Sequence, residues 1–250
     1  MSELFELAGK TALITGASGG LGEQFARALS DVGVRVILTA RRIGKLEVLS
    51  SEINNAKAIA LDVSDKGSVA SCFAELEKAG EKIDICINNA GIGLLTPIFE
   101  EDDKDVFETI IQTNLMGVWY VTKEVANHMK NHNIQGSIIN IGSINGDCVP
   151  ATNGCAYSVS KAAVIHLTKT LVGELSPHKI RINCISPGWF KTPMNGPDID
   201  RVISCIPYGD IANPSDMDGL VLYLSSNKAS RYVTGSCFTI DGGMSWGGKF

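Results

Sequence analysis

A glycine-rich turn at residues 16–22 constrains the fold of this chain more than any other feature of its sequence. An apolar run of strand length (residues 12–14) precedes the turn, and apolar residues at helical spacing (residues 23–29) follow it. Glycine permits positive φ angles and lets the backbone approach a ligand closely. The N-terminus of the following helix offers free N–H groups and the positive end of its dipole, which suit a pyrophosphate. The turn therefore predicts a dinucleotide site made by Gly16, Ser18, Gly19, Gly20, Leu21 and Gly22.

Strand-like and helix-like segments alternate along the rest of the chain. We expect strands at residues 34–39, 58–61, 83–87, 137–141, 180–185 and 237–240, and helices at 43–53, 67–79, 103–131, 156–175 and 214–224. This alternation predicts a mostly parallel sheet with helices on both faces. The expected fold class is α/β: a single-domain, doubly wound Rossmann fold over residues 1–250, with a seven-stranded sheet. The irregular residues 188–213 follow a strand end, and we expect a substrate lid there rather than a plain surface loop.

The composition argues against several classes of partner. The formal net charge of the 250 residues is −5, and a nucleic-acid surface would need a basic stripe, so we expect no nucleic-acid partner. No apolar stretch reaches the roughly 20 residues that span a bilayer, and the acidic N-terminal segment is unlike a signal peptide, so we expect no membrane association. Seven scattered cysteines without a Cys-x-x-Cys motif favour a reducing, cytoplasmic setting. The four histidines show no ligand spacing with cysteines or carboxylates, so no metal site is expected.

The residues after the expected second strand indicate which dinucleotide is bound. An acid at this place would accept hydrogen bonds from the ribose 2′-hydroxyl and repel a 2′-phosphate. Residues 34–46 contain no Asp or Glu, whereas Arg41 and Arg42 can bind phosphate through their guanidinium groups. The sequence therefore favours NADP(H) over NAD(H). Further cofactor contacts are expected from the residues that follow the third and fourth strands, namely Asp62, Val63, Asn89, Ala90 and Gly91.

Tyr157 and Lys161 are candidates for acid–base chemistry, because they lie four residues apart at the start of an expected helix and so share a face. A nearby ammonium would stabilise the phenolate of Tyr157 and lower its pKa, which suits a general acid or base. Ser143 follows the fifth strand at the same edge of the sheet, where its hydroxyl can hold a substrate oxygen. Asn114 is an amide in an otherwise apolar helical segment, and a water relay to Lys161 is one way to satisfy it.

The chain resembles the short-chain dehydrogenase/reductase family, of the compact type. The resemblance implies that Tyr157 exchanges a proton with the substrate oxygen and that Ser143 stabilises this oxygen. It also implies that Lys161 lowers the tyrosine pKa and holds the nicotinamide ribose, that Asn114 anchors a water relay, and that Thr192 contacts the nicotinamide. The matching motifs run in family order over nearly the whole chain: residues 15–22, residues 88–91, Asn114, Ser143, Tyr157 with Lys161, Pro187-Gly188 with Thr192, and residues 241–243.

Members of this family are usually homotetramers, so the resemblance implies a homotetramer here. In such assemblies the helices expected at residues 103–131 and 156–175 pack pairwise across one axis. The apolar, glycine-rich residues 238–250 agree with burial at a second interface. The chain departs from the family pattern at Gly142, where a serine is common, and in an interval from Ser143 to Tyr157 that is one residue longer than usual.

The residues expected around the substrate are mostly apolar. They are Gly93, Leu94, Leu95, Ser143, Ile144, Asn145, Cys148, Asn153, Tyr157, Trp189, Phe190 and Met194. Such a set fits an apolar ketone or an acyl chain with a 3-keto group, so reduction of a 3-oxoacyl thioester is the leading expectation. Carrier-protein reductases of the family have arginines where this chain has Ile134 and His178. Lys130 and Lys179 are nearby, so the kind of acyl carrier stays open.

Two other functions stay open. A polyol or sugar-acid dehydrogenase of the same family is one, because residues 187–192 also resemble those of some sugar-acid dehydrogenases. The other belongs to a different class: a non-catalytic protein that binds NADP as a sensor. The complete set of Asn114, Ser143, Tyr157 and Lys161 argues against a sensor, which has no use for a proton relay.

Overall fold

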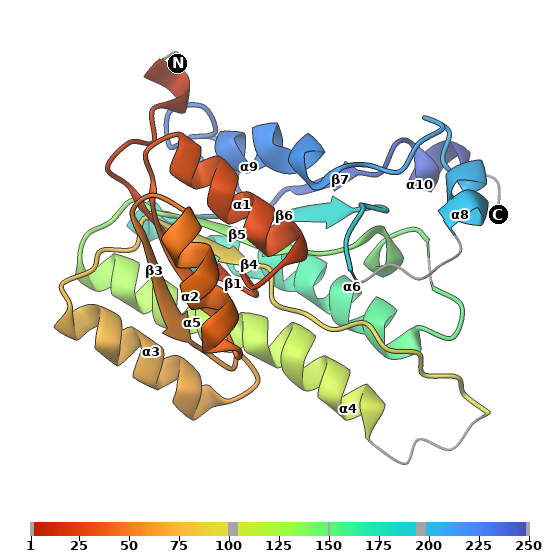
Figure 1. The fold of residues 1–250 in the computed structure, drawn as a ribbon, viewed down its shortest axis with the longest axis horizontal. Helices are drawn as coiled ribbons and strands as arrows, with labels where there is room; N and C mark the ends of the chain where they lie inside the picture. Colours follow the sequence, from red (N-terminus) through yellow and green to blue (C-terminus); the bar gives the residue numbers. More distant parts are fainter. Residues whose placement is uncertain (1–2, 100–104, 150, 194–198, 249–250) are drawn as a thin grey trace.

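The computed structural model describes residues 3–99, 105–149, 151–193 and 199–248, and its centre is one seven-stranded sheet (Figure 1). The strand order is β3-β2-β1-β4-β5-β6-β7, and every neighbouring pair is parallel. The predicted single-domain, doubly wound α/β fold is therefore confirmed. The strands are β1 (Thr11–Thr15), β2 (Arg35–Ala40), β3 (Ala56–Ala60), β4 (Ile85–Asn88), β5 (Ser137–Ile141), β6 (Arg181–Pro187) and β7 (Cys237–Ile240).

Helices cover both faces of the sheet, because successive residues of a strand point to opposite sides. In β1, Ile14 is buried in one core and Leu13 in the other. The core around Ile14 includes side chains of α1 (Gly20–Asp31), α2 (Ile43–Glu52) and α9 (Asp218–Ser225). The core around Leu13 includes side chains of α3 (Lys66–Lys78), α5 (Gly117–Asn131) and α7 (Val172–Leu175). The sheet is thus the middle layer of three, which explains why its central strands are apolar throughout.

The helix expected at residues 103–131 contains a π-helical turn. The structure has α4 (Val106–Ile111), a π-helix at Gln112–Met116 and then α5, and together they form one rod along the sheet (Figure 1). Residues 103 and 104 lie outside the described residues. A π turn inserts one residue into the helical hydrogen-bond ladder and is frequent at functional sites. Here it holds Asn114, whose side chain is fully buried.

The other differences from the expected elements are small. The helix expected at residues 156–175 is divided at Leu171 into α6 (Cys155–Thr170) and α7. The helix expected at 214–224 begins with a 3-10 turn, Pro214–Met217, before α9. Two short helices had no counterpart in the sequence analysis: α8 (Ile199–Cys205), inside the segment expected to be a lid, and α10 (Met244–Gly247).

The carboxyl ends of the seven strands lie along one edge of the sheet. β1 lies between β2 and β4. The strands β2 and β3 extend the sheet on one side of β1, and the strands β4 to β7 extend it on the other side. Open α/β sheets bind ligands in the crevice at such a switch point. The functional site is therefore expected beyond the ends of β1 and β4.

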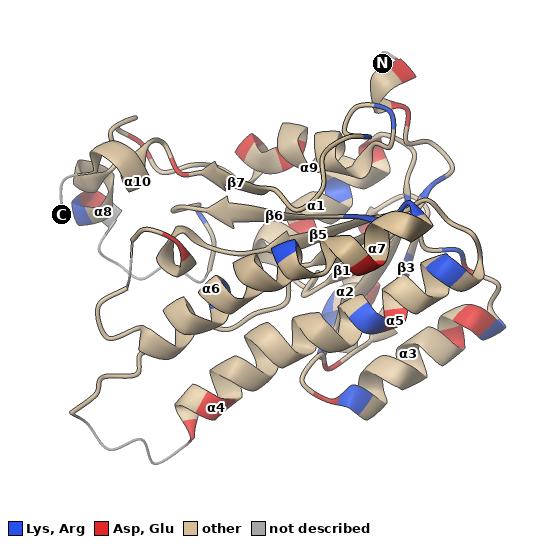
Figure 2. Ribbon diagram, turned by 180° about the vertical axis from the view of Figure 1, so that it is seen from behind, with Lys and Arg blue, Asp and Glu red and all other residues tan. Residues whose placement is uncertain are grey.

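Charged residues of both signs are dispersed over the back of the molecule. Figure 2 shows Lys or Arg and Asp or Glu together on both α3 and α5. Among the helices that the structure describes, none has the length and apolar character needed to cross a membrane.

Candidate active site

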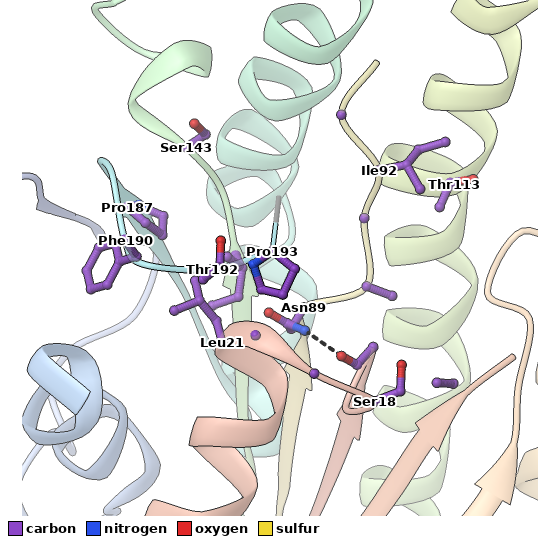
Figure 3. A pocket seen from close by; sticks show the side chains of 18 of the residues that line it. Ser18, Leu21, Asn89, Ile92, Thr113, Ser143, Pro187, Phe190, Thr192 and Pro193 are labelled. Atoms are coloured by element: carbon purple, nitrogen blue, oxygen red, sulfur yellow. Dashed lines mark hydrogen bonds between the residues drawn. The ribbon is translucent and has the colours of Figure 1, made fainter. Parts of the chain in front are cut away.

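A cavity of about 890 Å³ opens at the carboxyl edge of the sheet. Figure 3 shows Ile92 and Thr113 on one side of it and Pro187 and Phe190 on the other. Of the residues predicted to bind the cofactor, the structure brings together here Gly16, Ser18, Gly19, Gly20, Leu21, Arg41, Arg42, Asp62, Val63, Asn89, Ala90, Gly91, Tyr157, Lys161, Pro187, Gly188 and Thr192.

The glycine turn is shaped partly by packing and partly by backbone conformation. Gly22 does not line the cavity; a Cβ there would lie 2.4 Å from the carbonyl oxygen of Gly16, so α1 can approach the turn only without a side chain. Gly16 and Gly20 have φ angles of +67° and +60°, which strain other residues. The N-cap residue of α1, Gly19, has no side chain that could cap the helix, so it leaves the N–H groups of the first turn to a ligand. The turn therefore fits a pyrophosphate.

Asn89 braces this turn from the end of β4. Its Nδ2 donates to the carbonyl oxygen of Thr15 at 3.0 Å and to that of Gly16 at 3.2 Å. Figure 3 shows a hydrogen bond from Asn89 to the turn. The hydroxyl of Thr15 in turn accepts hydrogen bonds from the backbone N–H groups of Asn89 and Ala90, both at 3.0 Å. The amide hydrogens of Asn89 thus hold the glycine turn, and its contribution to the cavity is mainly structural.

Three cations line the cavity at the β2 end. Arg41 and Arg42 were predicted, whereas Lys45 was missed. Lys45 lies in the first turn of α2, four residues after Arg41, and this helical spacing is a signal that the sequence analysis could have used. Asp62, across from them at the end of β3, accepts hydrogen bonds from both the N–H and the hydroxyl of Ser64, at 3.0 and 2.6 Å.

Tyr157 and Lys161 share one face of α6, as their spacing predicts. The Lys161 ammonium lies 5.7 Å from the centre of the Tyr157 ring and donates to the carbonyl oxygen of Ile141 at 2.8 Å. Burial lowers the pKa of Lys161 to about 8. Burial raises the pKa of Tyr157, and a hydrogen bond with Ser143 opposes this. Desolvation therefore dominates the pKa of Tyr157 in this structure, and the lowering effect of Lys161 stays a prediction.

Asn114 finds protein partners for its amide. Its Oδ1 accepts from the N–H of Ile92 at 2.8 Å, and its Nδ2 donates to the carbonyl oxygen of Ile92 at 2.9 Å and to the hydroxyl of Ser160 at 3.1 Å. Ser160 donates in turn to the carbonyl oxygen of Tyr157 at 2.7 Å. Both amide hydrogens of Asn114 therefore have protein partners, and the water relay to Lys161 stays a prediction. Ser160 was missed, since a serine on a helix gives no signal by itself.

The structure confirms only part of the expected substrate set as lining the cavity. Ser143, Ile144, Asn145, Tyr157, Trp189, Phe190 and Gly93 line it. Asn153, Leu94, Leu95 and Cys148 do not: the carbonyl of Asn153 accepts from the N–H of Thr96, and Leu94 and Leu95 are largely exposed. Met194 lies outside the described residues.

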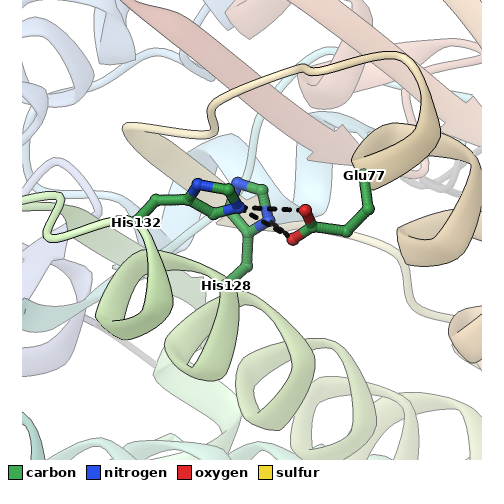
Figure 4. Close-up of side chains that lie close together, drawn as sticks. All are labelled: Glu77, His128 and His132. Atoms are coloured by element: carbon green, nitrogen blue, oxygen red, sulfur yellow. Dashed lines mark hydrogen bonds and ion pairs between the residues drawn. The ribbon is translucent and has the colours of Figure 1, made fainter.

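A second polar cluster lies away from this cavity, next to a hollow of about 490 Å³ between α3 and α5 (Figure 4). Nδ1 of His128 is 2.6 Å from a carboxylate oxygen of Glu77, and Nε2 of His132 is 2.9 Å from the other. The three ligand-type atoms lie within 4.8 Å of one another. The expectation that no histidine has ligand spacing is therefore wrong, because His128 and His132 share a helix face and Glu77 comes from another helix.

The hydrogen bonds of this cluster nevertheless oppose a cation. The N–H of Ile83 donates to Nε2 of His128, so a neutral His128 carries its proton on Nδ1 and donates it to Glu77. A cation at Nδ1 would displace that proton and leave the N–H of Ile83 without its acceptor. A tetrahedral zinc ion would also hold its ligand atoms about 3.3 Å apart, farther than the histidine nitrogens lie from the Glu77 carboxylate oxygens, at 2.6 and 2.9 Å. We describe Glu77, His128 and His132 as the clamp between α3 and α5.

Comparison with known proteins identifies the family. A family model described as short chain dehydrogenase matches residues 10–201. The chain belongs to the short-chain dehydrogenase family. Among its relatives, oxidoreductase UcpA of Salmonella typhimurium is 37% identical over 255 aligned positions, which cover 95% of each chain. The 3-oxoacyl-[acyl-carrier-protein] reductase FabG of Rickettsia felis is 35% identical, over 96% of this chain and 99% of the relative.

A solved short-chain dehydrogenase structure agrees closely with the fold. The crystal structure of a gluconate 5-dehydrogenase from Burkholderia cenocepacia, in complex with NADP and tartrate, has a TM-score of 0.90 at 29% identity and covers 97% of each chain. Short-chain dehydrogenases are oxidoreductases that act on carbonyl or alcohol groups with a nicotinamide cofactor. The predicted family, fold and reaction class are thereby confirmed.

Proposed function

We propose that this short-chain dehydrogenase is an NADP(H)-dependent oxidoreductase of apolar carbonyl compounds, with 3-oxoacyl thioesters as the leading substrate class. The observation that carries the proposal is the division of its cavity. Cations gather at the β2 end, whereas the end near β5 and β6 combines an acid–base pair with apolar walls.

The cofactor preference rests on Arg41, Arg42 and Lys45. They offer a 2′-phosphate three positive charges, two of them on guanidinium groups that bind phosphate in a bidentate manner. Residues 34–46 include no acid that would repel this phosphate. We assign the glycine turn to the pyrophosphate, Asp62 and Val63 to the adenine, Lys161 to the nicotinamide ribose, and Thr192 to the nicotinamide. A bound nicotinamide supplies the hydride chemistry.

The proton chemistry rests on Tyr157 and Ser143. Because burial raises its pKa, Tyr157 is protonated at neutral pH, which suits an acid that delivers a proton to a carbonyl oxygen during reduction. The hydroxyl of Ser143 lies within reach of Tyr157 and is held by the backbone N–H of Asn145 at 3.2 Å. We propose that Ser143 binds the same substrate oxygen. Asn114 and Ser160 act as positioning residues, since they hold Ile92 and the backbone of Tyr157.

The substrate class rests on the walls beside the acid–base pair. Ile92, Ile144, Trp189 and Phe190 supply apolar surface. Among the described residues that line this end, Lys161 is the only one with a cationic side chain, and it is bonded to Ile141. A carboxylate or phosphate on the substrate would therefore lack a free cationic partner here, and an acyl chain fits better.

A sugar-acid dehydrogenase is the second candidate. The likeness to a gluconate 5-dehydrogenase solved with NADP and tartrate favours it. The polar side chains at the substrate end oppose it: Nδ2 of Asn145 donates to the carbonyl of Val149 at 2.6 Å, and its Oδ1 accepts from Ser143. Few donors remain there for a polyhydroxylated acid.

Initial rates test both parts of the proposal. We expect acetoacetyl-CoA or a longer 3-oxoacyl thioester to be reduced faster than gluconate is oxidised. We also expect NADPH to be preferred over NADH by ten-fold or more, about 1.4 kcal/mol. Arg41→Ala should reduce this preference, and the exposed Arg231→Ala should not. Preference for NADH would overturn the cofactor assignment, and turnover of gluconate alone would overturn the substrate class.

We also propose that residues 188–213 act as a lid and that the protein is a homotetramer. The lid proposal is supported by Trp189, Phe190, Thr192 and Pro193, which line the cavity, and by the pairing of Phe190 with Ala212; residues 194–198 lie outside the described residues.

The tetramer proposal is supported by Trp246, whose side chain is 89% exposed in the isolated chain. Light scattering that gives the mass of one chain would overturn it.

A further inference from the structure

Two cysteines stand opposite each other on the last two strands of the sheet. Cys184 of β6 and Cys237 of β7 are register partners in the parallel ladder, and both are free thiols. Neighbouring strands lie about 4.8 Å apart, and disulfides join Cα atoms about 4.4–6.8 Å apart. The backbone therefore already holds this pair at a distance that a disulfide can span.

The surroundings of the two sulfurs differ. Cys184 is fully buried, and its Sγ lies only 2.9 Å from the place where a side chain on Gly142 would begin. Cys237 is partly exposed, and its Sγ lies 3.1 Å from the hydroxyl of Ser186, which is on the same face of β6 as Cys184. In the isolated chain, a small solute therefore reaches Cys237 before Cys184.

The pKa values of the two thiols are shifted in opposite directions. Interaction with Cys184, helped by a hydrogen bond from Ser186, lowers the pKa of Cys237 to about 7 against the effect of burial. Interaction with Cys237 together with burial raises the pKa of Cys184 well above its ordinary value. A thiolate is the nucleophile in cysteine chemistry, so the more accessible sulfur, that of Cys237, is the one expected to react first.

We propose that Cys184 and Cys237 form a redox modification site that reacts with a small hydroperoxide and closes to a disulfide. The Cys237 sulfur attacks one peroxide oxygen, the O–O bond breaks, hydroxide leaves, and Cys237 becomes a sulfenic acid. The Cys184 sulfur then attacks the Cys237 sulfur, the S–S bond forms, and the sulfenic oxygen leaves as hydroxide. The two hydroxides take up the two thiol protons. The pair is oxidised by two electrons, and hydrogen peroxide is reduced to two waters.

The position of the pair predicts an easily reversible bond. Disulfides prefer Cβ atoms about 3.8 Å apart, closer than directly paired strands usually bring them. Closing the bond must therefore draw β6 and β7 together, and a strained disulfide is more readily reduced. Such a bond suits a reducing compartment, where disulfides are transient.

Peptide mapping of the full-length protein tests the proposal. Trypsin releases Cys184 in residues 182–191 and Cys237 in residues 232–249, and each peptide contains one cysteine. After stepwise addition of hydrogen peroxide and alkylation of the remaining thiols, we expect these peptides to appear joined, with the loss of two hydrogen atoms. Dithiothreitol should separate them. Free thiols should fall from seven to five while Cys148, Cys155 and Cys205 can still be alkylated.

Variants separate the two steps. Cys237→Ser should leave Cys184 reduced and abolish the joined peptide. Cys184→Ala should leave Cys237 as a sulfenic acid that dimedone labels. Cys205→Ser, a matched change at another partly exposed cysteine, should leave the joined peptide unchanged. In the wild-type protein, the peptides of Cys184 and Cys237 could both remain alkylated at peroxide levels that already oxidise the exposed cysteines. This result would overturn the proposal, as would a disulfide from Cys237 to any other cysteine.

Discussion

Two polar clusters lie toward opposite ends of the same helical rod, and they differ in what they hold in place. Near the start of the rod, Asn114 and Ser160 pair with backbone groups and hold the backbone of Tyr157, whose side chain lines the cavity beside Ser143. Near the end of the rod, the clamp pairs both ring nitrogens of His128. The first cluster positions the residue that we propose as the proton donor, whereas the second joins two helices. A cluster of polar or titratable residues therefore indicates a functional site only where it positions a side chain in a cavity.

The largest effect is expected at the reactive group itself. Tyr157→Phe removes the hydroxyl but keeps the ring, so we expect kcat to fall about 10³-fold, within the range of general acid–base catalysis. Binding of NADPH, measured by fluorescence titration, should stay within a few-fold of wild type. Unchanged turnover would remove Tyr157 from the mechanism, and absence of turnover by the wild-type protein on every carbonyl tested would favour the sensor.

Asn114→Ala should give the next largest effect, because it releases Ile92 and Ser160 together. We expect kcat to fall about 10- to 100-fold and the free energy of unfolding to fall by about 2 kcal/mol, the cost of leaving buried polar groups unpaired. Ser160→Ala should give a smaller loss in kcat with the KM for NADPH unchanged. Stability and kinetics measured on the same preparations check this. A loss of stability without a loss of kcat would show that Asn114 contributes to stability alone.

Lys161 tests the electrostatics of the active-site end. Burial lowers its pKa from 10.5 to about 8. Between pH 8 and pH 10.5 the unfolded chain binds this proton more strongly than the folded chain, so the contribution of Lys161 to stability rises with pH. We expect Lys161→Met to be more stable than wild type at pH 7 by about 2 kcal/mol, because relief of the depressed pKa is worth about 3 kcal/mol and the lost hydrogen bond to Ile141 about 1 kcal/mol. The difference should shrink toward pH 10. Urea denaturation across this range checks the sign; a difference independent of pH would contradict it.

The clamp should affect stability without affecting chemistry. His128→Ala leaves the buried N–H of Ile83 unpaired and opens a cavity, so we expect a loss of about 2 kcal/mol in stability with kcat unchanged. His132→Ala is the matched control: its side chain is 31% exposed, and its ion pair with Glu77 should contribute less than about 1 kcal/mol. Equal losses from the two variants would contradict the hydrogen-bond argument.

The smallest expected effect is that of zinc. Adding Zn²⁺ to chelator-treated protein should leave the thermal unfolding temperature unchanged, because a cation must displace the Nδ1 proton of His128. A rise in unfolding temperature that His132→Ala and Glu77→Gln both abolish would show that the clamp is a metal site.

The sequence was sufficient for the fold because its signals are local. Apolar runs marked the positions of all seven strands, and the glycine turn marked where β1 meets α1. The sequence was insufficient for the two polar clusters, because hydrogen bonds between distant segments depend on tertiary packing. Asn114 was correctly singled out as a buried amide, but its partners Ile92 and Ser160 could not be read from its neighbours in the chain.

The substrate end was predicted less well than the cofactor end for the same reason. Strand ends fixed Arg41 and Asp62, whereas Asn153 belongs to a loop whose path follows from packing, and it turned away to bond Thr96. The dominance of desolvation in the pKa of Tyr157 was not predicted, because the degree of burial was unknown.

The divided cavity has an evolutionary consequence. Its cofactor end is built from the first half of the chain, and much of its substrate end comes from the turn after β5 and from residues 188–193 after β6. Mutations in the second set can alter the chemical identity of the molecule that enters without touching the glycine turn. A gene for such a protein can therefore be duplicated and diverge toward a new metabolite while it inherits an intact glycine turn.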